Sequence, residues 1–229
     1  MYKKLFYSLV FSVLVNHSVF GGESLIDKNM YTIGGYSVEE IENSGSYLKN
    51  SPIPRDPLTE IVFVVDTLIA VGKKIYTVVE AGKPILNTEF NNLSVLPKLD
   101  NGELADPFYD LDGWSYPVHK KYKISFKNLY GIEVVSFVYG ASMQYGGSFN
   151  GKGNYILGAH VYADSINVLW GFDVNAKVKT LAISNMGSKD EPVGAVQLIL
   201  DTTIKSVLVE HNHTHVFHFN GKGKISSNK

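Results

Sequence analysis

Histidines are concentrated in one short segment near the carboxyl end of the chain. Four of the seven histidines lie at positions 211, 213, 215 and 218. Alternate residues of a β-strand point to the same face, so a strand here would place His211, His213 and His215 side by side. Imidazoles gathered on one face are suitable ligands for zinc or copper. The spacing therefore predicts a metal site at His211, His213 and His215.

Two other interpretations of this segment stay open. A hairpin turn is expected at Glu210 to Asn212, which would interrupt the alternation and leave the histidines as polar residues at the rim of a loop. Glu210 is also the one nearby carboxylate available to complete or orient a metal site. Alternatively, clustered imidazoles repel one another once they are protonated, which is typical of a pH sensor.

The run Trp170-Gly171-Phe172-Asp173 is the second group of residues suited to a binding role. Aromatic rings pack against the flat faces of sugars, and a carboxylate accepts hydrogen bonds from hydroxyl groups. Trp170, Phe172 and Asp173 are therefore predicted to form a ligand surface. The alternative is a tryptophan in the protein core beside an acid at a strand edge.

Known catalytic patterns are missing from the sequence. The chain has no cysteine, which excludes a thiol nucleophile and thiolate metal ligands. It also lacks the Gly-x-Ser-x-Gly pattern of many serine hydrolases. The formal net charge is −1 and Arg55 is the only arginine, so the composition does not favour nucleic-acid binding. We expect a protein that is not an enzyme and does not bind nucleic acid.

Residues 1–21 have the layout of a secretory signal peptide. Lys3 and Lys4 precede an apolar run from Leu5 to Val15, and Gly21 follows as a small residue near the expected cleavage site. The apolar run is too short for a permanent membrane anchor. The sequence thus predicts export, either to a bacterial periplasm or out of the cell.

Residues 118–229 are predicted to form an antiparallel β domain. Segments rich in β-branched and aromatic residues alternate with turn sequences, among them Asn150-Gly151. Asn-Gly is the preferred pair for a type I′ hairpin turn. Strands at this spacing favour a β-sandwich or a small barrel.

The residues before this domain are predicted to form three parts. Residues 22–55 read as an N-terminal arm that is partly disordered, and residues 84–117 as an irregular acidic connector. Residues 56–83 are predicted to be one long apolar α-helix, because Asp56 and Pro57 suit its start and Gly82 suits its end. The predicted fold class is therefore mainly β with one long helix, α+β overall.

Two classes of function agree with these features. The first is an exported protein with a binding or structural role, whose partner is a protein, a glycan or a second copy of itself. The second is a membrane-active protein that forms pores or lies at the membrane surface, and that uses the 56–82 helix or its β-hairpins.

Overall fold

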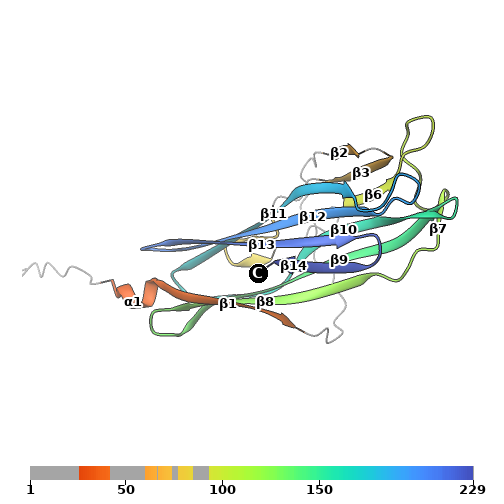
Figure 1. Cartoon of the computed structure of the whole chain (residues 1–229). Helices are drawn as coiled ribbons and strands as arrows, with labels where there is room; N and C mark the ends of the chain where they lie inside the picture. The colour runs from red at the N-terminus through yellow and green to blue at the C-terminus, as the bar shows by residue number, and fades with distance from the viewer. Residues whose placement is uncertain (1–25, 42–59, 66, 74–76, 85–92, 229) are drawn as a thin grey trace, which may run out of the picture.

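Two antiparallel β-sheets that share one apolar core make up most of the structure (Figure 1). This computed structural model describes residues 26–41, 60–65, 67–73, 77–84 and 93–228. In that part of the chain, the one helix is α1 (Lys28–Tyr31). The first sheet contains β1 (Ile33–Ile41), β2 (Glu60–Val65), β3 (Leu68–Lys73), β6 (Leu93–Pro97), β7 (Leu111–Asp112), β8 (Val118–Asn128), β9 (Glu133–Phe149) and β10 (Lys152–Val168). The second sheet contains β4 (Val79–Glu80), β5 (Lys83–Pro84), β11 (Phe172–Asn185), β12 (Gly194–Ser206), β13 (Glu210–Asn220) and β14 (Lys224–Asn228).

The strand order follows the chain over its second half. The first sheet has the order β1-β8-β9-β10-β6-β3-β2, with β7 paired to β9, and the second has the order β14-β13-β12-β11-β4-β5. From β8 to β14, each strand except β10 pairs with the next strand along the chain, and the link from β10 to β11 crosses from one sheet to the other. Successive strands run in opposite directions, so their turns alternate between two ends of the molecule.

We name each end of the molecule after one residue that lies in a turn at that end. The Trp170 end holds the turns 129–132, 169–171 and 207–209, and the Asn150 end holds the turns 150–151, 186–193 and 221–223. In Figure 1, the turns of the Trp170 end project on the same side as α1, and β7 lies at the opposite side. Asn150 and Gly151 have φ values of 52° and 72°, which confirms the predicted type I′ turn.

Aromatic rings from both sheets fill the space between them. Tyr122 and Tyr139 of the first sheet are fully buried, with ring centroids 5.5 and 6.1 Å from that of Phe217 in the second sheet. The alternation of buried and exposed residues along β13 directs its odd-numbered side chains toward this core. Burial of large aromatic side chains of this kind is the main source of stability in a domain without disulfides.

The mainly β, antiparallel part of the predicted fold is confirmed, and the long apolar helix is wrong. Residues 60–65 and 68–73, inside the predicted helix, form the paired strands β2 and β3, with Glu60 opposite Lys73 and Val65 opposite Leu68. This segment is rich in β-branched residues, which lose side-chain freedom in a helix and favour strands. Consecutive burial of Leu68, Ile69 and Ala70 shows a strand covered on both faces, whose pattern resembles that of a buried helix.

Other parts of the predicted organisation are only partly described by the structure. The described part of the N-terminal arm is ordered as α1 and β1, and β1 pairs with β8. The predicted connector contains β6, a fully buried strand between β3 and β10. The predicted signal peptide and the rest of the arm lie outside the described residues. Within the described residues, no helix has the length and apolar character needed to cross a membrane.

The aromatic core gives a direct test of the fold. Replacing Phe217 by alanine removes a fully buried ring between the two sheets, and we expect the free energy of unfolding to fall by about 3–5 kcal/mol. Phe108→Ala is the matched control, because the Phe108 side chain is 81 % exposed, and its effect should stay within about 0.5 kcal/mol. Urea unfolding followed by circular dichroism measures both. Equal stability of the two variants would contradict this packing.

Candidate functional site

A cleft of about 940 Å³ lies at the Trp170 end, beside the last residues of β10. Four segments line it: the β4–β5 turn at residues 81–83, the start of β9 at 133–136, residues 166–173 from β10 into β11, and residues 206–207 at the end of β12. From His160 to Val168, β10 has pairing partners only on its β9 side among the described residues. The cleft therefore follows an open edge of the first sheet, where backbone polar groups are available to a ligand.

All three residues of the predicted ligand surface line this cleft. Trp170 lies in the turn between β10 and β11 with 87 % of its surface exposed, so the alternative of a core tryptophan is wrong. Phe172 is buried, and its ring centroid is 5.9 Å from that of Tyr31 in α1. Gly171 between them has a φ of 85°, a conformation that glycine adopts without strain. The turn thus holds one aromatic ring in the core and presents the other to solvent.

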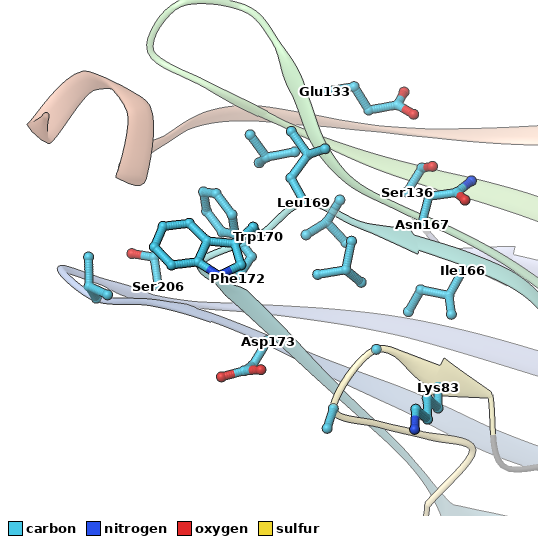
Figure 2. A pocket seen from close by; sticks show the side chains of 17 residues that line it. Lys83, Glu133, Ser136, Ile166, Asn167, Leu169, Trp170, Phe172, Asp173 and Ser206 are labelled. Carbon is cyan, nitrogen blue, oxygen red and sulfur yellow. The ribbon is translucent and has the colours of Figure 1, made fainter.

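Polar residues of both sheets are among those that line the cleft. Figure 2 shows Glu133, Ser136 and Asn167 on the side of the first sheet, and Asp173 and Lys83 on the side of the second. Among the described residues, neither the Asp173 carboxylate nor the Lys83 ammonium group forms an ion pair or a side-chain hydrogen bond. Both charged groups are consequently free to contact a ligand.

Glu133 is in a different situation, because neighbouring groups already stabilise its charge. Hydrogen bonds from Ser125 in the first place, and then from Ser136 and Lys123, lower the pKa of the Glu133 carboxyl below its usual value. The Lys123 ammonium nitrogen lies 3.3 Å from one Glu133 carboxylate oxygen. An ionised Glu133 is an acceptor only, so it suits a ligand that offers hydroxyl or amino donors.

The cleft combines an apolar ring with hydrogen-bonding groups of several kinds. The Trp170 indole provides a flat surface, Asp173 and Glu133 accept hydrogen bonds, and Asn167 both donates and accepts. Small-molecule sites usually have this combination of an apolar lining and a few polar groups that fix orientation. Sequence reasoning found Trp170, Phe172 and Asp173, but missed Lys83, Glu133 and Asn167. Those three come from separate segments, and no local pattern marks them.

The histidines of the predicted metal site lie on one strand and point into the space between the sheets. The turn before β13 is at Ser206 to Val209, where the Ser206 amide donates to the Val209 carbonyl over 2.8 Å, so the turn predicted at 210–212 is wrong. β13 therefore alternates without interruption from Glu210, and His211, His213 and His215 share its inner face. His215 is fully buried, His213 is nearly so, and His211 is half-buried.

Each of the three imidazoles packs against aromatic rings of the first sheet. Ring centroids are 5.7 Å apart for His211 and Phe126, 4.7 Å for His213 and Tyr36, and 4.9 Å for His215 and Tyr122. The Nδ1 atom of His215 is also hydrogen-bonded to the Tyr139 hydroxyl at 2.6 Å. The described residues contain no cluster of three histidine, cysteine or acidic side chains able to hold a metal ion. Metal binding by these histidines stays an untested prediction.

No protein-family model, no curated protein and no solved structure matches this chain. The function is therefore argued from the cleft and the surfaces around it.

Burial of His213 predicts that the fold is less stable in acid. Burial, and secondarily the nearby His211, lower the pKa of His213 below its usual value of 6.5. As the pH falls through 6.5, the unfolded chain takes up a proton that the folded chain does not, so acid favours the unfolded state. We expect the free energy of unfolding to be smaller at pH 5 than at pH 7.5.

His213→Phe should weaken this pH dependence while keeping a ring between Tyr36 and Phe126. Some dependence should remain, because burial also lowers the pKa of His160. The control is His218→Asn on the other face of β13, which should keep the wild-type slope of stability against pH. Urea unfolding at a series of pH values measures the slope, and an unchanged slope in His213→Phe would contradict the assignment.

Proposed function

We propose that the protein is an exported, non-enzymatic β-sandwich protein that binds a carbohydrate in the cleft beside Trp170. The observation that carries this proposal is the Trp170 side chain, 87 % exposed at a cleft that also contains Asp173. Packing of this exposed ring against a ligand would gain the free energy of burial, and its place at a cleft with hydrogen-bonding groups is typical of a binding site. Export is supported by the N-terminal sequence alone.

The chemistry of the cleft favours a sugar over other small ligands. A pyranose ring has an apolar face of C–H groups that packs on an indole, and a rim of hydroxyl groups that donate to carboxylates and accept from amides. Asp173, Glu133 and Asn167 are among the residues that line the cleft and can supply such groups. The cleft contains both acidic and basic side chains, so a neutral polyhydroxylated ligand fits better than a strongly charged one.

The test is a screen of the purified protein on a panel of neutral oligosaccharides, followed by calorimetric titration of those that bind. Trp170→Ala and Asp173→Asn should each weaken binding by about tenfold or more, equivalent to about 1.4 kcal/mol. Phe108→Ala and Asp190→Asn are matched controls, because they remove an exposed aromatic ring and an exposed carboxylate far from the cleft. Both controls should bind like the wild type.

Two outcomes would contradict the proposal. One is the absence of binding to every oligosaccharide of the panel. The other is binding that survives Trp170→Ala and Asp173→Asn, which would place the sugar site elsewhere on the molecule. Thermal unfolding of the variants confirms that they are folded, and both changed side chains are exposed, so little change is expected.

A further inference from the structure

The turns of the Trp170 end form a second surface, distinct from the polar part of the cleft. The three turns come from both sheets and from separate parts of the chain, and Figure 1 shows them projecting at the same end. Each turn exposes large apolar side chains: Leu129, Tyr130 and Ile132 at 55, 55 and 48 %, Leu169 at 41 %, and Val207 and Leu208 at 62 and 39 %. Exposed apolar residues gathered in this way mark an interaction surface.

The composition of these turns differs from that of the turns at the Asn150 end. Residues 129–132, 169–171 and 207–209 include no charged residue, although 19 % of the whole chain is charged. At the Asn150 end, the turns 150–151, 186–193 and 221–223 include Lys189, Asp190, Glu191 and Lys222. Both sets of turns connect the same strands, so the apolar composition is specific to one end and does not arise from hairpin geometry.

Backbone amides of the turn 129–132 are bonded within the protein. The Asn128 side-chain oxygen accepts hydrogen bonds from the amides of Tyr130 and Ile132, each at 3.0 Å. The Gly131 amide donates to the Asn128 carbonyl over 2.9 Å, and the Leu129 amide donates to the Thr32 carbonyl over 3.1 Å. All four amides of residues 129–132 therefore have a partner that is not water.

Turn 207–209 repeats this arrangement with a serine. The Ser206 hydroxyl oxygen accepts hydrogen bonds from the amides of Leu208 and Val209, at 3.2 and 3.1 Å. In a lipid environment, an amide without a partner costs several kcal/mol, so internally bonded amides allow a turn to leave water.

We propose that the Trp170 end docks on a lipid bilayer, with the three turns inserted as far as the boundary between headgroups and acyl chains. Insertion by about 5–10 Å is typical of surface-bound proteins. Tyr130 and Trp170 are the aromatic types that concentrate at this boundary. Separate projecting turns without charged residues suit the fluid, uncharged boundary of a neutral bilayer. The docking surface shares Leu169, Trp170 and Val207 with the lining of the cleft, whereas Leu129, Tyr130, Ile132 and Leu208 lie outside that lining.

Flotation with phosphatidylcholine vesicles tests this docking. The purified wild-type protein should float with the vesicles, and 1 M salt should not release it, because the turns carry no charge. The double variant Val207→Asp, Leu208→Asp places two charges on one turn and should bind about tenfold or more weakly. Phe108→Asp, Tyr116→Asp is the matched control, since both side chains are at least 81 % exposed and lie outside the Trp170 end. This control should float like the wild type.

A second measurement uses the protein without substitutions in the turns. Brominated phosphatidylcholine should quench the fluorescence of Trp170, which is exposed at the docking end, more than that of Trp114, which is half-buried. A Trp114→Phe variant isolates the Trp170 signal. Asp173→Asn, which tests the carbohydrate site, should leave flotation unchanged, so the two proposals succeed or fail separately.

Several results would overturn the lipid proposal. They are a wild-type protein that does not float, equal loss of flotation in the control variant, or binding only to anionic vesicles that is lost in high salt. A dimer mass in light scattering that becomes monomeric in Val207→Asp, Leu208→Asp would also overturn it, because the surface would then belong to a second copy of the chain. Matching thermal unfolding of the variant and wild type confirms that the variant is folded.

Discussion

Contact between β13 and the strands β8 and β9 holds the two sheets together. Phe217 packs against Tyr122 and Tyr139, and the Tyr139 hydroxyl is hydrogen-bonded to His215 at 2.6 Å. Burial raises the pKa of Tyr139, so the phenol stays protonated within its hydrogen bond to the imidazole Nδ1. A buried polar pair of this kind avoids the cost of two unsatisfied groups, and its geometry fixes how one sheet lies over the other. The positions of all turns follow from that alignment.

The cleft is a consequence of where the sheets cease to cover each other. β10 crosses from the first sheet toward β11 in the second, and over its last residues it pairs only with β9 within the described chain. The open edge, the crossing turn at 169–171 and the β4–β5 turn meet there and enclose the space beside Trp170. Tyr31 of α1 packs beneath Phe172, and the Ser206 hydroxyl donates to the Tyr31 carbonyl over 2.7 Å. The N-terminal segment thus supports the turn that presents Trp170.

The sequence allowed correct predictions where local patterns decide structure. Alternation and Asn-Gly turns predicted the antiparallel strands that the structure describes between residues 118 and 228. Trp170, Phe172 and Asp173, predicted as a ligand surface, line the cleft, and ligand binding there stays a prediction. The helix at 56–83 was wrong because a strand buried on both faces lacks alternation and resembles a buried helix. Lys83, Glu133 and Asn167 were missed because pairing across the sheets, and not chain order, brings them together. The aromatic partners of the histidines were missed for the same reason.

The turns at the two ends of the molecule carry different kinds of side chains, although the same strands lead into both sets of turns. At the Asn150 end, glycine and charged residues make turns that suit water, and the amides of Lys222 and Lys224 donate to the Asn220 side chain. At the Trp170 end, Asn128 and Ser206 satisfy turn amides in a similar way, but the side chains around them are apolar. The turns at the two ends therefore differ in side-chain character although both use side-chain acceptors for their amides. Exposed apolar side chains gathered at one end are typical of an interaction surface, and this is the basis of the docking proposed there.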